Sequence, residues 1–526
     1  MQAKKKSGDF FIQMSFLSMC VLLVLLSLFL GVILSNGLRA FWASDLTLFE
    51  MKNGEFYLGE KVQEKKKHTG EMKLQIKIAN RDLYGEDFKW VFEKNIKSMT
   101  KPKRAFVAER KHGGNLFAYL SKDKIKESEV NLLWKKFDDK NQQIKKGYPE
   151  YEKLKADVLE VTKEINEMKK LRKKLVYYER SDTEIEKCDE ALAILKIKSD
   201  QRDHLAIEKF SKLEEVYSTV WDANGREITI THTDVVRSYR PNSMGLFDKI
   251  SLYTEKVVEL LTSDPRESNT EGGLFPTIFG TVILVFMMSV ASFPLGVIAG
   301  IYMKEYAKDG PVVRIVRIAV NNLAGIPSIV FGIFGLGFFI YGIGGEIDKM
   351  FFPEMLPEPT FGTGGLFWAS LTLGLLTVPI VIVATEEALG VIPGGLREAA
   401  TALGANKFQI LYKVLLPMAS PGIMTGFILA MSRAAGEVAP LMITGVVKSA
   451  PDLLLTTEAP FLHLDRKFMH LGFHIFDVGF QSPNVEAAMP MVYVSTLLLL
   501  VIIITMCSFA IYLRSNMRKR FIGSHL

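Results

Sequence analysis

Apolar residues are concentrated in six long runs of the 526-residue chain. One run lies near the N-terminus, at about Met14–Leu34, and five lie in the C-terminal half, at about 275–303, 316–343, 366–389, 417–446 and 488–513. Each run has about 20 residues or more, which is the length that a helix needs to cross a bilayer core of about 30 Å. The pattern therefore predicts an all-α multi-pass membrane protein with six transmembrane helices.

The first apolar run follows a basic start, Lys4-Lys5-Lys6, as the apolar region of a signal peptide would. The residues after the run, Ser35-Asn36-Gly37-Leu38-Arg39, contain no Ala-x-Ala-like cleavage site. We therefore predict that residues 1–36 keep a cytoplasmic N-terminus and an uncleaved first transmembrane helix.

Basic residues predict how the six helices are oriented. The tail 514–526 contains Arg514, Arg518, Lys519 and Arg520, and the loop after the second helix contains Lys304, Lys308, Arg314 and Arg317. In a six-helix count both segments lie on the side of the N-terminus, and positive charge favours the cytoplasmic side. Both termini are predicted to be cytoplasmic. Residues 37–270 are predicted to lie outside, where a long domain can be translocated largely regardless of its charge.

The polar insert 37–270 shows two kinds of periodicity. Alternating apolar residues at Leu74, Ile76 and Ile78, followed by the turn Gly113-Gly114, predict short strands. Further along, Asn224-Gly225 lies between two β-branched runs and predicts a two-residue hairpin turn, because both residues tolerate positive φ. A small sheet and closing strands are therefore expected.

The middle of the insert, about 149–217, has the three-to-four-residue repeat of a helix. The repeat is formed by Leu154, Val158, Val161, Ile165, Met168, Leu171 and Leu175, and after Ser181-Asp182 by Ile185, Cys188, Leu192 and Leu195. This spacing predicts a helical hairpin or short coiled coil, so the insert is expected to be mixed α/β. The insert contains no catalytic motif. We therefore interpret it as a spacer or docking surface, and a ligand-binding or signalling role is the alternative.

Charge and cysteine content change this picture little. The 65 Lys and Arg residues exceed the 58 Asp and Glu residues by a formal charge of +7, but the two signs are interleaved through the insert. Nucleic-acid binding is therefore not predicted. Cys188 is the single cysteine of the insert, while Cys20 and Cys507 fall in apolar runs, so no disulfide is expected within the insert.

A charged segment at 394–417 separates the fourth and fifth apolar runs. It reads Arg397-Glu398-Ala399-Ala400-Thr401-Ala402-Leu403-Gly404-Ala405-Asn406 and continues as Phe408-Gln409-Ile410-Leu411-Tyr412-Lys413-Val414-Leu415-Leu416-Pro417. A charged start, small alanines and a glycine that permits a turn are features of a helix that receives a partner. An interfacial helix lying on the membrane is the alternative.

The order Glu-Ala-Ala, Gly and then Leu-Pro resembles the EAA loop of the permeases of ATP-binding-cassette (ABC) importers. The resemblance implies that Glu398, Ala399, Ala400 and Gly404 belong to a coupling helix that docks on an ATPase, and that Leu416-Pro417 ends the loop. It also implies a type I ABC importer permease fold, with the core at 271–513. The chain has no Gly-x4-Gly-Lys-Ser/Thr phosphate loop, so the ATPase is expected to be a separate chain and this chain not an enzyme.

Three further segments resemble the PstA-type phosphate permeases: 322–332, 434–441 and Thr385-Glu386-Glu387-Ala388-Leu389. The resemblance covers about 270–513 and the position of the first span. It implies a bacterial inner-membrane importer of inorganic phosphate, with a PstC-type second permease, a dimer of ATP-binding subunits that carries ATP and Mg, and a periplasmic phosphate-binding protein. No cofactor is expected on this chain itself. The long insert departs from the family pattern, as does Val438 where Thr is frequent.

Two ionisable residues, Arg433 and Glu437, fall in the predicted fifth span and are four residues apart. That spacing predicts one shared helix face, and intramembrane charges usually face a cavity or each other. The hypothesis is that Arg433 attracts the anion while Glu437 holds Arg433 and accepts a hydrogen bond from a protonated phosphate, which sulfate cannot donate. A structural ion pair without substrate contact is the alternative.

Three histidines, His463, His470 and His474, lie between the fifth and sixth apolar runs, near Asp465 and Asp477. His470 and His474 have the i, i+4 spacing of two metal ligands on a helix, but no cysteine supports a site, and no metal site is assigned. Two other functions stay open: a permease for another oxyanion such as molybdate, sulfate or phosphonate, and a non-transporting membrane scaffold or sensor.

Overall fold

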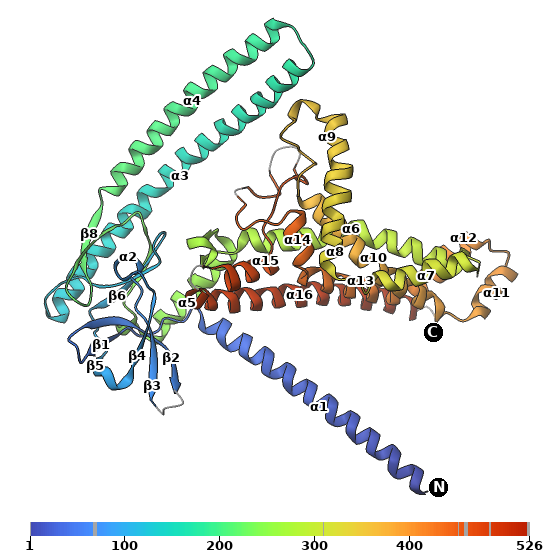
Figure 1. Ribbon diagram of the computed structural model, residues 1–526, viewed down its shortest axis with the longest axis horizontal. Coiled ribbons are helices and arrows are strands. Elements are labelled where there is room, and N and C mark those ends of the chain that lie inside the picture. Colours follow the sequence, from blue (N-terminus) through green and yellow to red (C-terminus); the bar gives the residue numbers. More distant parts are fainter. Residues whose placement is uncertain are drawn as a thin grey trace. The chain divides into compact units, whose positions relative to one another are not determined.

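The computed structural model describes residues 2–66, 71–308, 310–450, 452–456, 461–482 and 485–522 (Figure 1). The chain forms two compact units. The membrane unit contains the chain up to Ala40 together with Leu274–Phe352 and Glu358–Leu526. The insert unit contains Phe41–Gly273 and the short segment Pro353–Pro357. Each unit has hydrophobic clusters of its own, so the two are described separately.

The membrane unit confirms six helices that are long and apolar enough to cross a bilayer, within the described part of the chain. They are Phe10–Arg39, Phe275–Tyr306, Ser328–Phe351, Leu366–Gly390, Lys407–Gly436 and Val485–Met517. The first and last belong to α1 (Gln2–Arg39) and α16 (Val485–Ile522), and the second to α6 (Phe275–Ile301) with its π-helical end η4 (Tyr302–Tyr306). The fourth is α10 (Leu366–Gly390). Apolar length therefore predicted the number of spans and the approximate positions of four of them.

The third span differs from its predicted position at 316–343. Residues Pro311–Leu323 form a separate helix, α7, and the span begins only at Ser328, running through α8 (Ser328–Phe334), the π-helix η5 (Gly335–Gly344) and α9 (Gly345–Phe351). Pro327 explains the break, because its ring disfavours a helical conformation of the residue before it and it has no N–H to donate.

The fifth span is also displaced from the prediction of 417–446. It begins earlier, through α12 (Lys407–Ile410) and the π-helix η7 (Leu411–Leu415), and continues as α13 (Leu416–Gly436). The helix ends at Gly436, since Glu437 has an extended backbone with φ −78° and ψ 134°. A new short helix, α14 (Ala439–Thr444), starts with Pro440 in its first turn, where a missing N–H costs nothing.

Helix α10 is the most buried of the six described spans, and small residues let two neighbours approach it closely. A Cβ added to Gly296 or Gly300 of α6 would lie 2.7 Å from Val381 or Thr385 of α10. On the other side, added Cβ atoms at Gly422 and Gly426 of α13 would meet Ala388 and Ala384 of α10. Each pair of glycines has the small-xxx-small spacing that brings membrane helices together.

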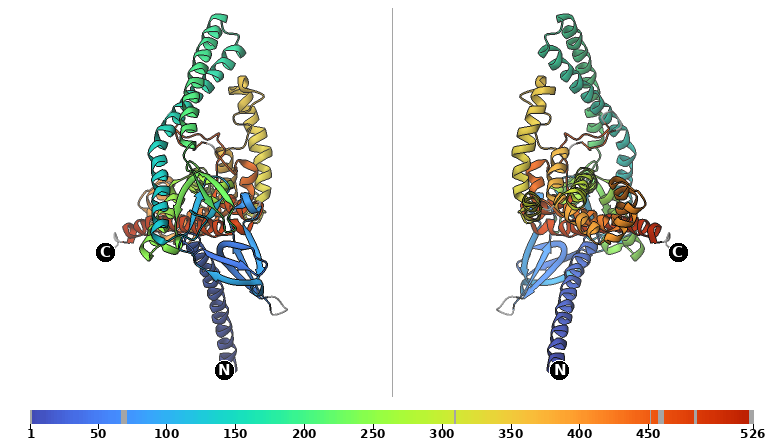
Figure 2. Two further views of the ribbon diagram at one scale, coloured as in Figure 1. Left: turned by 90° about the vertical axis from the view of Figure 1, so that its left-hand side faces the viewer. Right: turned by 90° about the vertical axis from the view of Figure 1, so that its right-hand side faces the viewer.

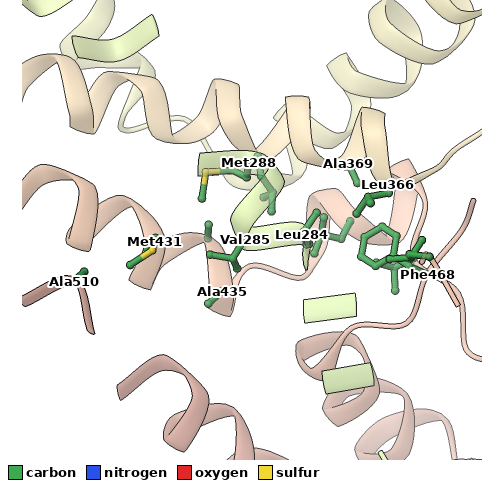
Figure 3. Packing of buried hydrophobic residues seen from close by; sticks show 14 residues of the cluster. Leu284, Val285, Met288, Leu366, Ala369, Met431, Ala435, Phe468 and Ala510 are labelled. Atoms are coloured by element: carbon green, nitrogen blue, oxygen red, sulfur yellow. The ribbon is translucent and has the colours of Figure 1, made fainter. Parts of the chain in front are cut away.

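The main hydrophobic cluster of the membrane unit lies around these three helices (Figure 3). Leu284, Val285 and Met288 of α6 contact Leu366, Ala369 and Leu373 of α10, and the cluster is completed by Met431, Ala434, Ala435, Leu441, Val446, Leu454, Phe468 and Ala510. The described part of the segment before α16 also forms α15 (Leu471–Phe476) and the π-helix η8 (Asp477–Gln481).

The insert unit contains two five-stranded antiparallel sheets. The first has the order β4-β3-β2-β1-β5 and is formed by β1 (Thr47–Met51), β2 (Phe56–Lys66), β3 (Met72–Lys77), β4 (Phe88–Phe92) and β5 (Ile96–Thr100). The second has the order β10-β6-β7-β8-β9 and is formed by β6 (Ala105–Arg110), β7 (Asn115–Tyr119), β8 (Tyr217–Trp221), β9 (Glu227–Thr231) and β10 (Val235–Tyr239).

Short elements complete this unit. They are α2 (Arg81–Tyr84), η1 (Glu93–Asn95), η2 (Pro241–Ser243), α5 (Leu246–Thr262), β11 (Pro265–Arg266), η3 (Glu267–Asn269), β12 (Glu271–Gly272) and η6 (Pro353–Met355). Of the residues whose alternation predicted a strand, Leu74 and Ile76 lie in β3, and Ile78 directly follows it.

The two predicted turns of the insert differ in detail. Gly113 and Gly114 both have positive φ, 80° and 69°, and connect β6 to β7 as expected. At the second turn only Gly225 has positive φ, 78°, and the Asp222 N–H donates to the Arg226 carbonyl. The loop therefore has three residues between paired positions rather than the two predicted, a common alternative in hairpins.

The helical hairpin consists of α3 (Glu127–Tyr177) and α4 (Asp182–Glu214), which lie side by side in Figures 1 and 2. It begins at Glu127, well before the predicted start near 149. The first part of α3 buries Val130, Phe137 and Ile144, which are seven residues apart, so the apolar repeat is sparse there. Pro149 lies inside α3 without ending it. A proline removes one backbone hydrogen bond, and this loss does not end a helix of 51 residues that packs on both sides of the proline.

Candidate functional site

The segment between α10 and α13 folds into two short helices joined by a glycine turn. Helix α11 (Gly394–Ala402) ends at Leu403, and Gly404 follows with φ +81°, a conformation that side chains other than glycine rarely adopt. The Gly404 N–H donates to the Thr401 carbonyl at 2.9 Å. Asn406 then caps α12, its Oδ1 accepting from the Gln409 N–H at 2.8 Å. The turn therefore depends on Gly404.

The predicted coupling residues lie on different faces of α11. Glu398 and Ala399 are exposed, as is Leu403, whose side chain is 89% accessible. Ala400 is half-buried and packs against a cluster of Ile301, Leu389, Ile392, Ile410, Leu411, Leu415, Ala419 and Ile423 at one end of α6, α10 and α13. The loop thus rests on three spans through Ala400 while Glu398 and Ala399 remain accessible.

Arg397 anchors this loop to two transmembrane helices. Its Nη2 lies 2.7 Å from Oε1 of Glu305, and its Nε donates to Oε2 of Glu305 at 3.3 Å. Its remaining donors reach the carbonyls at the end of α10, with Nη1 2.9 Å from Ile392 O and Nη2 3.1 Å from Leu389 O. Sequence reasoning did not single out this contact, because Glu305 lies 92 positions before Arg397.

The predicted charge pair meets at the end of α13. Arg433 Nε lies 3.4 Å from Glu437 Oε1, and the two side chains are 35% and 19% exposed. They do not share a helix face as predicted, because Glu437 lies in the break between α13 and α14. The break places the Glu437 carboxylate beside the last turn of α13, which contains Arg433. The helix dipole favours the positive charge of Arg433 at this end of the helix.

A second charge pair in the membrane unit was not predicted as a pair. Arg317 Nε of α7 lies 3.6 Å from Glu386 Oε2 of α10. The other carboxylate oxygen of Glu386, Oε1, is buried without a hydrogen-bond partner in the described structure. Buried unpaired carboxylate oxygens are costly, and such groups in membrane segments commonly mark functional sites.

The three histidines do not form a metal site among the described residues, where no group of three or more His, Cys, Asp or Glu could hold a metal ion. His470 Nδ1 accepts from the Gly472 N–H at 3.1 Å and caps α15, while His463 Nε2 lies 3.1 Å from Thr456 Oγ1. His474 is buried, and Asp477 pairs with Lys448 at 3.1 Å. His470 therefore has a structural role as a helix cap.

Residues 292–521 match the family model described as "Binding-protein-dependent transport system inner membrane component". The chain is also 31% identical over 253 residues to the "Probable ABC transporter permease protein YqgI" of Bacillus subtilis, and this match covers 46% of the chain and 80% of that protein. The chain belongs to the family of ABC importer permeases. The matched region includes the loop carrying Glu398 and Gly404 and the pair Arg433 and Glu437.

Matches to other relatives of this permease cover a smaller share of the relative's length. It is 36% identical over 197 residues to the "Phosphate transport system permease protein PstA" of Yersinia pestis, covering 38% of the chain and 58% of that protein. It is 33% identical over 172 residues to the protein of the same name from Mycobacterium leprae, covering 33% of the chain and 51% of that protein. The permease therefore spans little more than half the length of these two relatives.

Among solved structures, one titled "Inward facing conformations of the MetNI methionine ABC transporter" matches at 20% identity and a TM-score of 0.33, covering 47% of this chain and 94% of that chain.

The family model leaves residues before 292 unmatched, so the insert 37–270 lies outside the region that defines the family.

Proposed function

We propose that this permease carries inorganic phosphate across the bacterial inner membrane, driven by ATP hydrolysis on separate subunits. The observation that carries the proposal is the similarity to two PstA proteins, at 36% and 33% identity, in a chain of the ABC importer permease family. The chemistry of the charge pair and the geometry of the loop support it further.

The charge pair supplies the chemistry for an anion. The guanidinium of Arg433 offers a planar set of donors that matches two oxygens of a phosphate, and the side chain is accessible enough to be reached. Glu437 holds Arg433 from one side and can accept a hydrogen bond from a protonated phosphate. Sulfate has no proton to donate at neutral pH, so the carboxylate would repel it.

The loop 394–417 is the proposed coupling element. Glu398 and Ala399 face outward to receive the ATP-binding subunit, while Ala400 and the turn at Gly404 keep the helix against the spans. Arg397 would pass a displacement of the loop to α6 and α10 through Glu305 and the Leu389 carbonyl. ATP and Mg would bind only to the partner ATPase, with no cofactor on this chain.

The proposed assembly contains a PstC-type second permease, a dimer of ATP-binding subunits and a periplasmic phosphate-binding protein, all within or beside membrane lipid. Both termini are placed in the cytoplasm and the insert 37–270 outside, as the basic segments suggest. In this arrangement the insert serves as a spacer or docking surface.

Two alternatives lead to different measurements. A permease for molybdate, sulfate or phosphonate would keep the coupling loop and change the substrate. A scaffold or sensor would need no transport, and the exposed, well-formed coupling helix disfavours it.

Phosphate uptake tests the proposal. Cells lacking other phosphate importers would carry the wild-type permease or Gly404→Asp, and uptake of radiolabelled phosphate would be measured with sulfate and molybdate as competitors. We expect selective uptake by the wild type and loss in the variant. Gly54→Asp is the control, because Gly54 also has a positive φ and no neighbour within 4 Å but lies outside the loop. Equal membrane levels of the proteins must be shown by immunoblot. If the wild type moves no phosphate, the substrate assignment is wrong.

A further inference from the structure

The outer part of the helical hairpin has a thin hydrophobic seam. Between α3 and α4 it buries Val161, Ile165, Cys188 and Leu192, with Met168, Leu175 and Leu195 packed around them. Other large apolar side chains of the hairpin remain exposed: Leu159, Leu171, Val176, Tyr177, Tyr178, Ile194, Ile197, Leu205 and Ile207. At about 1.5 Å per residue, α3 is about 75 Å long. The exposed apolar side chains are therefore distributed along an elongated hairpin.

A groove of about 590 Å³ lies between the two helices in this region, defined by Lys169 and Arg172 of α3 and by Asp189, Leu192, Ala193, Lys196 and Ile197 of α4. One wall is apolar, formed by Leu192, Ala193 and Ile197. The polar lining consists of three cations and a single carboxylate. The groove therefore combines an apolar wall with an excess of positive charge.

The single carboxylate of the groove is already neutralised. Arg172 Nε and Nη2 contact the two oxygens of Asp189 at 2.5 and 3.1 Å, a bidentate pair between the helices. Arg172 also holds the pKa of the Asp189 carboxyl below its usual range by hydrogen bonding to it. Lys169 and Lys196 form no salt bridge within the described chain. The charge of Lys196 acts on Asp189 from a distance, but the ammonium groups of both lysines remain accessible to a ligand.

We propose that this hairpin groove binds an acidic amphipathic segment of a partner protein. Such a segment would place its apolar side chains on Ala193 and Ile197, which are exposed in the groove. Its carboxylates would lie on Lys169 and Lys196, as in the binding of amphipathic helices to hydrophobic grooves with charged rims. Inorganic phosphate would leave the apolar wall without a contact. A flat lipid surface would not enter a concave groove between two helices.

This inference concerns the insert unit and does not depend on phosphate transport. It rests on the proposed topology only for the side of the membrane on which the partner is found. Failure of the uptake experiment would leave the groove unaffected, and failure of the binding experiment would leave the transport proposal unaffected.

Peptide binding to the full-length permease tests the proposal. The permease would be reconstituted in nanodiscs of zwitterionic lipid, and fluorescence anisotropy would follow a labelled amphipathic helical peptide of Glu and Leu. A peptide with Gln in place of each Glu is its neutral control. We expect the acidic peptide to bind about tenfold more tightly than the neutral one, and its affinity to fall as salt is raised.

Matched variants locate the site. Lys169→Glu with Lys196→Glu should weaken binding by about tenfold or more. Lys153→Glu with Lys155→Glu changes the net charge equally at exposed positions of α3 outside the groove and should leave the affinity within about twofold. Circular dichroism must show the same helix content for both variants. Arg172 is left unchanged, so that the bridge to Asp189 stays intact.

The proposal would be overturned by no binding of the acidic peptide, by equal binding of the neutral peptide, or by equal loss in the two double variants. Self-association of the permease that the Lys169 and Lys196 changes abolish would also overturn it. Vesicles containing phosphatidylglycerol are the comparison for a lipid ligand. If they displace the peptide and depend on the same lysines, the groove recognises a lipid surface instead.

Discussion

Arg397 Nη2 lies 2.7 Å from Glu305 Oε1, and this contact joins the proposed coupling helix to the end of α6. Both side chains are mostly buried, at 28% and 17% exposed, so the pair is better shielded from solvent than a surface salt bridge. It is supplemented by two hydrogen bonds to the carbonyls at the end of α10. One arginine therefore joins the loop to the ends of both α6 and α10.

Replacing this arginine should uncouple ATP hydrolysis from transport. Arg397→Ala removes four contacts and leaves Glu305 without its partner, a loss of about 1–3 kcal/mol in holding the loop. We expect phosphate uptake to fall by about tenfold or more while the complex still assembles. Uptake and ATP hydrolysis by the same membranes provide the measurement. Unchanged uptake per ATP hydrolysed would contradict the anchoring role, and Arg397→Lys should keep part of the function.

Replacing the carboxylate of the Arg433–Glu437 pair should weaken selection against sulfate. Glu437→Gln removes the negative charge but keeps the shape, so Arg433 can still bind an anion while the amide can donate to a fully ionised oxyanion. We expect phosphate uptake to fall by about tenfold and sulfate to become a better competitor. Competition assays at fixed phosphate measure this. A structural pair would instead lower the amount of assembled complex without changing the ratio of the two anions.

Enlarging a glycine at the contact between α10 and α13 should destabilise the membrane unit. A Cβ at Gly426 would collide with the Ala384 methyl group, and overpacking of this kind costs about 1–3 kcal/mol. We expect Gly426→Ala to lower the thermal unfolding temperature of the purified permease in detergent. Gly31→Ala is the matched control, because nothing lies within 4 Å of a Cβ at that position of α1. Equal unfolding temperatures for the two variants would show that α10 and α13 accommodate the added methyl group without loss of stability.

The insert should lose stability in mild acid through His232. Its ring lies between Ser218 Oγ, 2.8 Å from Nε2, and Asn141 Oδ1, 2.6 Å from Nδ1, and packs on Phe137. Burial, with the charge of Lys140 adding to it, lowers the pKa of His232 from 6.5 to about 4. Between these values the unfolded chain binds more protons than the folded one, so the free energy of unfolding falls as pH decreases from 6.5 to about 4.

Tryptophan fluorescence during urea unfolding of the full-length permease can follow this loss, since Trp134 packs beside Phe137. The wild type is compared with His232→Gln over the same pH range, because other carboxylates of the insert also titrate there. We expect the difference in unfolding free energy between the two proteins to shrink as the pH falls. A difference that stays constant with pH would mean that the pKa of His232 is the same in the folded and unfolded states, and would contradict the expected effect of burial.

Sequence periodicity predicted the six spans, the small sheet and the hairpin, since each depends on a local pattern of apolar residues. It misplaced the ends of the third and fifth spans because apolar content continues across the breaks at Pro327 and Glu437. Pro327 lies at the first break, and Pro440 lies in the first turn of the helix after the second. The extra turns of α3 before Pro149 were missed because one buried apolar residue in seven is a weak pattern.

The candidate site could be predicted only in part. Glu398, Ala399, Ala400 and Gly404 followed from a short motif, and the structure shows which of them are exposed. The contacts of Arg397 with Glu305 and of Arg317 with Glu386 join residues far apart in the chain. A single sequence contains no local pattern that pairs such residues, so only the folded arrangement of α6, α7 and α10 reveals them.

The glycines that bring α6 and α13 against α10 also limit how this permease can change conformation. Because Gly296, Gly300, Gly422 and Gly426 leave almost no gap to α10, sliding one helix along another would force backbone and methyl groups into overlap. The three helices are therefore expected to move as one rigid body, with the breaks at Pro327 and Glu437 serving as hinges. A displacement at the loop would then move the opposite end of α10 as well, instead of being absorbed between the helices.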